Sequence, residues 1–512
     1  MKMELSSLQK KIIISTIIWG VLAHFFLFTN VLIEFDAAYF INNVGGTIEL
    51  GRWGLYILKN VMDTLFYGTY NTPWLIGCVS VSCFIVVNLL LVSLFDIKDE
   101  LMAIIVSGVM ILNPATLGIF YFAYTAPYYF ISLILAVLSV WILNKNIDKW
   151  IYIVIAGVII AFSMGIYQAM VTVTAMIMLF ILLGNLLWKK DIKPKDIFCQ
   201  GVKYAVTLGF GGGLYLVINK IVIHITNTVT SSYRGMDTIK YTDFLKINYK
   251  ELVKVLLDIN DPLYYFKVFV EKTSIIYQLS VLTIILISIC VVMVCFKNRD
   301  FLRGILILII LFLMPIAANP FAIVDLGMVT TLMQISRCLF FIFFIVMIKN
   351  ICQNMKCSWM KNTLVYLSFA MILYTNIYYV YYDNRCYSEA ELRKMESISW
   401  MTTLIAQIKD LEGFDENMNI AYIQNGEMQD HTFISDKSMV SLDERLYYGD
   451  IRKHYSWKQY MKIWCGFEMT EVSSEVMEKI KADHIVEEMP VYPNDGSIQI
   501  VDGTIVVKFN EF

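Results

Sequence analysis

About eleven apolar stretches, each long enough to cross a lipid bilayer, recur along this chain and constrain its fold more than any other feature. A membrane span needs roughly 20 apolar residues, because an α-helix rises about 1.5 Å per residue and the hydrocarbon core is about 30 Å thick. Only 16% of the residues are charged, against about 25% in ordinary soluble domains. The sequence therefore predicts an α-helical polytopic membrane protein. The predicted spans are 12–33, 73–95, 101–121, 127–143, 150–163, 168–187, 202–223, 274–296, 303–317, 331–348 and 362–382.

The distribution of lysine and arginine orients these spans. With the N-terminus in the cytoplasm, the cytoplasmic loops include the basic clusters at 189–195 and 297–303, whereas the short outer loops carry only Arg52, Lys59 and Arg337. Because basic residues favour the cytoplasmic side, we expect a cytoplasmic N-terminus, an odd number of spans and an outer C-terminus. The short spans 150–163 and 303–317 could instead be re-entrant, and losing both would leave the C-terminus outside.

Residues 383–512 differ from the rest in that charged side chains become frequent. Helical patterns alternate there with short strand-like runs, and Asp502-Gly503 between the last two runs is a hairpin signal. We expect a small extracytoplasmic α/β domain after a transmembrane domain over 1–382. A disulfide between Cys386 and Cys465 is one alternative if this domain lies outside the cell. The expected helices are 388–410, 456–465 and 473–482, and the expected strands are 420–423, 484–486, 497–501 and 504–509.

Prolines and one amphipathic segment interrupt the apolar pattern. Asn113-Pro114 is predicted to break the third span, and Pro127 to begin the fourth, because proline lacks a backbone donor and disfavours helix in the residue before it. Residues 54–67 have apolar side chains on one helical face and predict a helix lying along the membrane surface.

Two outer loops, 34–72 and 225–273, are candidates for function. The first holds Glu34 and Asp36 just after the first span, where charge is costly unless it is satisfied or functional. A carboxylate can act as the general base of an inverting sugar transfer. We choose Asp36 for that role, with Glu34 as the second catalytic candidate. The alternative is that both residues only mark the water interface.

The same loop carries Arg52, in Gly51-Arg52-Trp53-Gly54. A guanidinium can meet phosphate oxygens with two hydrogen bonds, so Arg52 is predicted to bind a donor phosphate. Arg337 is a second phosphate candidate in the 317–337 loop, where an interfacial anchor is the alternative. Candidates for substrate contact are Glu49, Trp53, Tyr124, Tyr167, Gln168 and Arg234.

Several function classes find no support. The net charge of −2 gives no electrostatic basis for binding nucleic acid. No cluster of His, Cys and carboxylate residues has the spacing of a metal site, and no cofactor is expected. A divalent cation shared by Glu34 and Asp36 stays open. Residues 209–213 are mostly glycine without the Lys-Ser/Thr of a phosphate loop, which favours close helix packing, and His24 is interpreted as a satisfied core residue.

An ordered series of short motifs resembles the bacterial type II Gtr glucosyltransferases. These are polytopic enzymes of the GT-C class that modify surface polysaccharides such as O-antigen. The resemblance covers chiefly residues 20–190. In chain order the series is Leu27-Phe28-Thr29-Asn30, Asp36 with Tyr39, Gly51-Arg52-Trp53, Pro73-Trp74-Leu75, Asn113-Pro114, Phe122-Ala123-Tyr124-Thr125-Ala126 and Ser163-Met164-Gly165-Ile166-Tyr167-Gln168-Ala169.

The resemblance implies a GT-C-like fold and transfer of a hexose, glucose in the family, from a polyprenyl-phosphate donor such as the undecaprenyl-phosphate sugar. The acceptor would be a glycan on the outer face of the bacterial cytoplasmic membrane. An acidic residue of the first outer loop would be the base, which is Asp36 by position. Family members often show further polar or acidic character around the second outer loop, whereas this chain has Thr125-Ala126-Pro127-Tyr128, without an acidic residue.

Three other functions fit the sequence less well. A polysaccharide polymerase or ligase would use a lipid-diphosphate donor and show several arginines in a long outer loop, but 225–273 has only Arg234 besides lysines. A transporter or flippase of lipid-linked sugars needs polar groups at bilayer depth and related halves with broken helices, whereas here the sequence places the polar residues at the outer rim. A scaffold that displays the C-terminal domain would leave the charged first loop unexplained.

Overall fold

The computed structural model of the chain forms two compact units. The first comprises Met1–Asn30 and Asn42–Asn384, and the second comprises Val31–Ile41 and Arg385–Phe512. The structure describes residues 5–31, 45–66, 72–189, 191–231, 301–318, 320, 331–353, 357–424 and 457–510, with residues 282, 285–286, 289–290 and 293.

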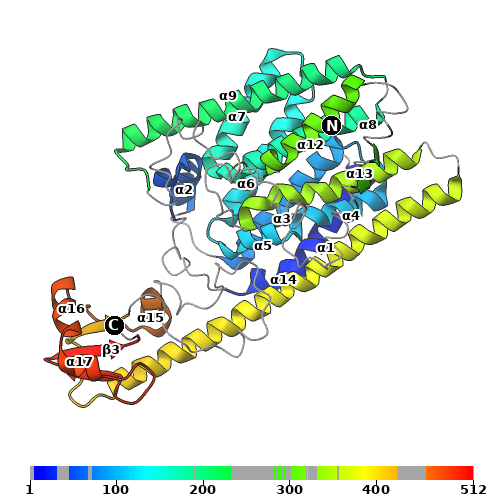
Figure 1. Cartoon of the computed structure of the whole chain (residues 1–512). Coiled ribbons are helices and arrows are strands. Elements are labelled where there is room, and N and C mark those ends of the chain that lie inside the picture. Colours follow the sequence, from blue (N-terminus) through cyan, green and yellow to red (C-terminus); the bar gives the residue numbers. More distant parts are fainter. Residues whose placement is uncertain are drawn as a thin grey trace. The chain divides into compact units, whose positions relative to one another are not determined.

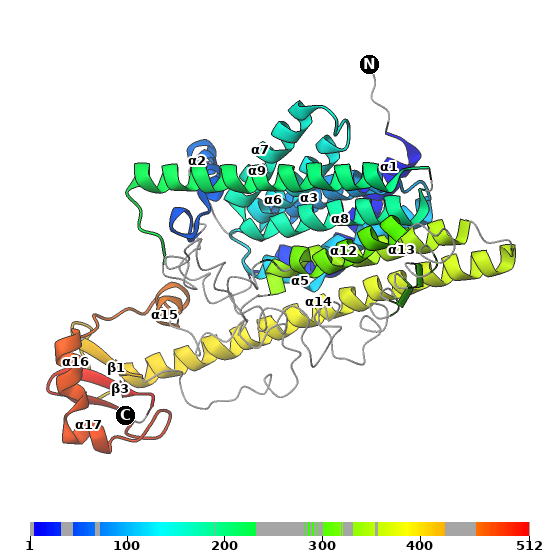
Figure 2. The same cartoon turned by 45° about the horizontal axis from the view of Figure 1, so that its top comes forward.

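The first unit is built of helices (Figures 1 and 2). The elements of this unit are α1 (Ser7–Thr29), η1 (Ile48–Leu50), α2 (Trp53–Phe66), α3 (Pro73–Leu94), α4 (Glu100–Ile111), α5 (Pro114–Tyr121), α6 (Ala126–Leu143), α7 (Trp150–Ile166), η2 (Gln168–Met170), α8 (Val171–Trp188), α9 (Pro194–Thr226), α12 (Phe301–Ala318), η7 (Thr331–Cys338), α13 (Leu339–Gln353) and the first part of α14 (Ser358–Lys409). Helix α1 packs against α3 and α4, while α6 packs against α3, α7 and α8. The long helix α9 lies along α7 and α8, as Figure 2 shows.

Within the described residues, eight helices are long and apolar enough to cross a membrane. Helices α4 and α5, bent by 42° at their junction, would count together as a ninth. Helix α7 is apolar but has 17 residues. The polytopic helical class is therefore confirmed. The count of eleven spans stays a prediction, because most of 274–296 lies outside the described residues.

Both proline breaks are present. Helix α4 ends at Ile111 and α5 begins at Pro114, where the side chain of Asn113 accepts a hydrogen bond from Ala115 N at 2.9 Å. Pro127 lies in the first turn of α6, which suits a residue without an N–H group.

Helix α2 matches the amphipathic helix predicted over 54–67. Lys59 and Asp63 pair along it at 2.7 Å, four residues apart. Its apolar side chains Ile57, Val61 and Leu65 are 46%, 47% and 63% exposed. An apolar helix face left open in this way is typical of a helix at a membrane surface.

The glycines at 209–213 pack closely at only one position. A Cβ atom at Gly211 would lie 2.9 Å from the carbonyl oxygen of Gly157 on α7, so glycine lets the backbones of α7 and α9 approach. Added Cβ atoms at Gly209, Gly212 and Gly213 would meet nothing within 4 Å. The predicted packing role thus holds for Gly211 alone.

The second unit holds a three-stranded sheet in the order β1-β3-β2. Strand β1 is parallel to β3, with Ile420 opposite Ile505, and β2 is antiparallel to β3. Asp502 and Gly503 both have positive φ angles, 47° and 74°, as the predicted tight hairpin requires. The elements of the second unit are the end of α14, β1 (Asn419–Ile423), α15 (Trp457–Cys465), α16 (Ser474–Lys481), α17 (His484–Glu488), β2 (Ile498–Val501) and β3 (Thr504–Lys508).

Helices cover this sheet through two apolar clusters. Met401, Leu404 and Ile408 of α14 form the first cluster with side chains of β1 and β3. Other side chains of the same two strands form the second cluster with Ile480 and Val486.

The strand predicted over 484–486 is wrong. Those residues begin α17, because the side chain of Asp483 accepts a hydrogen bond from Ile485 N at 2.8 Å and caps a helix there. The structure has no disulfide between Cys386 and Cys465.

Candidate functional site

Five polar and aromatic residues of the first unit meet around the turn that precedes α2. Arg52 comes directly before that helix, Tyr129 lies in the first turn of α6, and Tyr215 lies on α9. Tyr167 follows α7, and Gln168 begins η2. We call Arg52, Tyr129, Tyr167, Gln168 and Tyr215 the arginine–tyrosine cluster.

Gly51 shapes the turn that carries Arg52. Its φ angle is 72°, in the left-handed region, and its N–H donates to the carbonyl of Ile48 at 2.9 Å. The next N–H, of Arg52, donates to the carbonyl of Thr47 at 2.8 Å. A Cβ atom at Gly51 would come within 2.6 Å of the hydroxyl of Tyr215. Glycine is therefore required both for the backbone conformation and for the close approach of α9.

Hydrogen bonds tie this turn to two other elements. Gln168 Nε2 donates to the carbonyl of Leu50 at 2.7 Å, and it lies 3.1 Å from the hydroxyl of Tyr215. That hydroxyl in turn donates to the carbonyl of Gly51 at 3.1 Å. Because Tyr215 is buried, these bonds hold the turn in a fixed place against η2 and α9.

The guanidinium of Arg52 lies close to two stacked tyrosine rings. The rings of Tyr129 and Tyr167 are parallel within 7°, with centroids 4.1 Å apart. The Cζ atom of Arg52 is 5.7 Å from each centroid. Both distances are within the range of about 6 Å over which a cation is attracted to an aromatic ring, so the two tyrosines help to hold the guanidinium in place. An arginine held in this way keeps in-plane N–H groups that suit the oxygens of a phosphate.

Two predicted substrate residues, Trp53 and Glu49, brace the same turn. The Trp53 side chain is 1% exposed and fits against Gly165 of α7, where a Cβ atom would come within 2.5 Å of the indole. Glu49 Oε1 accepts from Thr47 N at 3.1 Å, and the Glu49 carbonyl accepts from Ser231 N at 3.0 Å. Their contact with a substrate stays a prediction.

The other predicted residues lie in different elements or outside the described residues. Arg337, 1% exposed, is on η7, which packs against α5, α8 and η2. Tyr124 lies between α5 and α6, with its ring 6.2 Å from that of Phe122. Their proposed roles stay predictions. The three residues outside the described part of the chain are Glu34, Asp36 and Arg234.

The described residues hold no group of three His, Cys, Asp or Glu side chains placed to bind a metal ion. Glu34 and Asp36, for which a shared cation was an alternative, lie outside that part of the chain. The cation alternative is therefore a matter for experiment.

Sequence reasoning missed Tyr129 and Tyr215, because a single tyrosine in an apolar helix has no distinctive pattern. It also missed a buried polar contact between three helices. Asn88 of α3 donates to Thr16 Oγ1 at 3.0 Å and to the carbonyl of Ser107 at 2.9 Å, and all three residues are buried. These bonds join α1, α3 and α4.

The turn at Gly51 supports a direct prediction. Gly51→Ala should destabilise the protein by at least about 1–2 kcal/mol, the cost of a left-handed conformation for an L-residue, and its methyl group would also push against Tyr215. Gly213→Ala is the control, because that helical position is open and alanine favours a helix. Thermal unfolding in detergent micelles measures both. Equal melting temperatures for the two variants would contradict the role given to Gly51.

Comparison with known proteins gave one match. The family model described as Glucosyl transferase GtrII matches residues 25–348, more than half of the 512-residue chain. That stretch contains the whole arginine–tyrosine cluster and reaches beyond the residues 20–190 in which the motif series was found. No curated protein and no solved structure gave a match.

Proposed function

The chain belongs to the Glucosyl transferase GtrII family and is a membrane glycosyltransferase; on this premise we propose that it moves one hexose, with glucose the first candidate, from a polyprenyl-phosphate donor to a cell-surface glycan. The reaction would take place at the outer face of a bacterial cytoplasmic membrane, on a GT-C-like fold with an extracytoplasmic C-terminal domain. The fixed guanidinium of Arg52 is the observation that carries the proposal.

A polyprenyl-phosphate sugar combines one anionic phosphate with a long apolar tail. Arg52 offers a cation held by Tyr129 and Tyr167, with its guanidinium carbon 5.7 Å from each ring centroid. Directly after it, α2 exposes apolar side chains such as Val61 and Leu65. A phosphate bound at Arg52 could therefore have its tail along the open face of α2, at the level where lipid tails begin.

The proposed chemistry is a single displacement. Asp36 removes the proton of an acceptor hydroxyl, whose oxygen attacks the anomeric carbon of the donor sugar. The bond from that carbon to the phosphate oxygen breaks, and its electron pair leaves with the polyprenyl phosphate. Arg52 and Arg337 stabilise the phosphate, and attack opposite the leaving group inverts the anomeric configuration. No cofactor is needed, and Glu34 is the second acid close to Asp36 in sequence.

Transfer of labelled sugar in proteoliposomes tests this function. We expect the full-length protein to transfer hexose from a synthetic polyprenyl-phosphate donor to a glycan acceptor, with and without a chelator. Activity that disappears with the chelator would instead favour a divalent cation. Transfer only from a polyprenyl-diphosphate donor would favour a polymerase or ligase, and movement of the donor across the bilayer without transfer would favour a flippase.

A further inference from the structure

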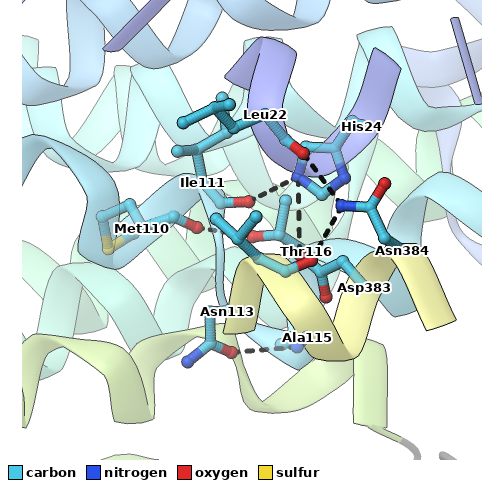
Figure 3. Close-up of polar contacts among 10 residues, drawn as sticks. Leu22, His24, Met110, Ile111, Asn113, Ala115, Thr116, Asp383 and Asn384 are labelled. Atoms are coloured by element: carbon cyan, nitrogen blue, oxygen red, sulfur yellow. Dashed lines mark hydrogen bonds and ion pairs between the residues drawn. The ribbon is translucent and has the colours of Figure 1, made fainter. Parts of the chain in front are cut away.

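A histidine and an aspartate that are not part of the arginine–tyrosine cluster meet inside the helical unit. His24 lies on α1 and Asp383 on α14, and both side chains are 0% exposed. His24 Nε2 is 3.9 Å from Asp383 Oδ2. Figure 3 shows the two side chains pointing toward each other beside the junction of α4 and α5.

The broken helix explains why His24 is there. Pro114 has no N–H for the carbonyl of Met110, and the hydroxyl of Thr116 donates to that carbonyl at 2.7 Å instead. The N–H of Ala115 is used by the side chain of Asn113, so the carbonyl of Ile111 loses its helical donor as well. His24 Nε2 lies 2.8 Å from this second carbonyl. Because a carbonyl only accepts, Nε2 must carry a proton.

Asp383 is less well satisfied than His24. Among the described residues, neither of its carboxylate oxygens has a hydrogen-bond partner. The neighbouring amide of Asn384 is directed elsewhere, to the carbonyls of Leu22 and Val380, each at 2.8 Å. An ionised carboxylate without a partner is very unfavourable in a dry interior, and such groups take up a proton or pair with a cation.

Two charge states avoid that cost. Either Asp383 is a carboxylic acid beside a neutral imidazole, or it is a carboxylate beside an imidazolium. Each state holds one proton more than the two separate groups hold in water at neutral pH. We propose that His24 and Asp383 form a proton-binding site that holds a single proton between α1 and α14 at the broken helix. No part of the proposed sugar transfer uses this site.

Among the described residues, other titratable groups close to the pair come from α14 and η7. Tyr379 lies one turn earlier on α14, and Cys338, at the end of η7, is its neighbour. Arg385 pairs with Glu389 at 2.8 Å. The segments 22–27 and 110–116, which face the pair from α1 and from the α4–α5 junction, contain His24 as their only titratable residue.

The melting temperature of the full-length protein as a function of pH tests the site. Above about pH 6.5, the ordinary pKa of histidine, the folded wild type would hold one proton that the unfolded chain has lost. Stability should therefore fall as the pH rises from about 7 to about 9. In Asp383→Asn the folded chain holds no such proton, so the melting temperature should fall less over that range. Groups on the surface titrate alike in both proteins, so their contribution cancels in the difference between the two profiles.

A second variant decides the matter if Asp383→Asn does not fold. In His24→Gln an amide can still donate to the carbonyl of Ile111, but no imidazole remains. Between about pH 4 and 6.5 the unfolded wild type carries a proton on this histidine, so the folded and unfolded wild type hold equal numbers of protons at the two positions. The site then adds no pH dependence to the wild-type melting temperature. In folded His24→Gln, Asp383 keeps a proton that the unfolded chain has lost, so the melting temperature of this variant should fall as the pH rises over that range. Profiles parallel to that of the wild type for either variant would overturn the proposal.

Discussion

Asp36→Asn is expected to lower the kcat of hexose transfer by about 10²–10⁴-fold, the usual contribution of a general base. Asparagine keeps the shape of aspartate, but its amide cannot take the proton of the acceptor hydroxyl. The variant should still bind the donor, because the proposed phosphate contact belongs to Arg52. Initial rates with a labelled polyprenyl-phosphate sugar, at matched amounts of folded protein, give kcat, and a lipid-donor binding assay gives affinity.

Glu34→Gln is the matched control for that variant. It removes the other carboxylate of the same stretch, two residues earlier in the sequence. If Asp36 is the base, this change should alter kcat only a few-fold. An Asp36→Asn enzyme with wild-type rates would refute the assignment, and a large loss in Glu34→Gln alone would transfer the role to Glu34.

Arg52→Ala should lower kcat/KM by roughly 10–100-fold, because a hydrogen bond to a charged group contributes about 1.5–3 kcal/mol. Arg52→Lys should recover only part of the loss. Lysine keeps the charge but cannot reproduce the planar contact with Tyr129 and Tyr167 or offer two parallel N–H groups to a phosphate. Donor titration in the transfer assay measures both variants.

Lys59→Ala is the control for Arg52. Lys59 is another cation of the same predicted outer loop, but its ammonium pairs with Asp63 at 2.7 Å. Its removal should leave kcat/KM nearly unchanged. Equal losses in Arg52→Ala and Lys59→Ala would mean that the loop attracts the donor by net charge, without a specific phosphate contact at Arg52.

Features written into consecutive residues could be predicted from the sequence. Apolar runs gave the membrane helices, Asn113-Pro114 gave the break between α4 and α5, and Asp502-Gly503 gave the hairpin. The series of short motifs indicated the same family as the match to the family model over residues 25–348. The failure at 484–486 is also local, because a short apolar run fits a strand until the capping by Asp483 is recognised.

Contacts between distant residues could not be predicted in this way. The sequence marks Arg52 as a charged residue in a predicted outer loop. Nothing in the sequence near Tyr129 or Tyr215 indicates that these tyrosines lie beside it. His24 and Asp383 are separated by most of the chain. His24 is a single polar residue in an apolar stretch, and Asp383 begins the polar run Asp383-Asn384-Arg385, so only the packing of α1 against α14 reveals that they form a pair.

The capped break between α4 and α5 bears on how the chain assembles during synthesis. Chains fold from their N-terminal parts first, so α1, with His24, enters the membrane before α4 is made. When the α4–α5 segment follows, His24 is already present to donate to the carbonyl of Ile111. The donor for the carbonyl of Met110, Thr116, is part of the same segment. Asp383 comes much later. The backbone carbonyls at the break can therefore be hydrogen-bonded within the early helices, before the carboxyl group of Asp383 is added to the site.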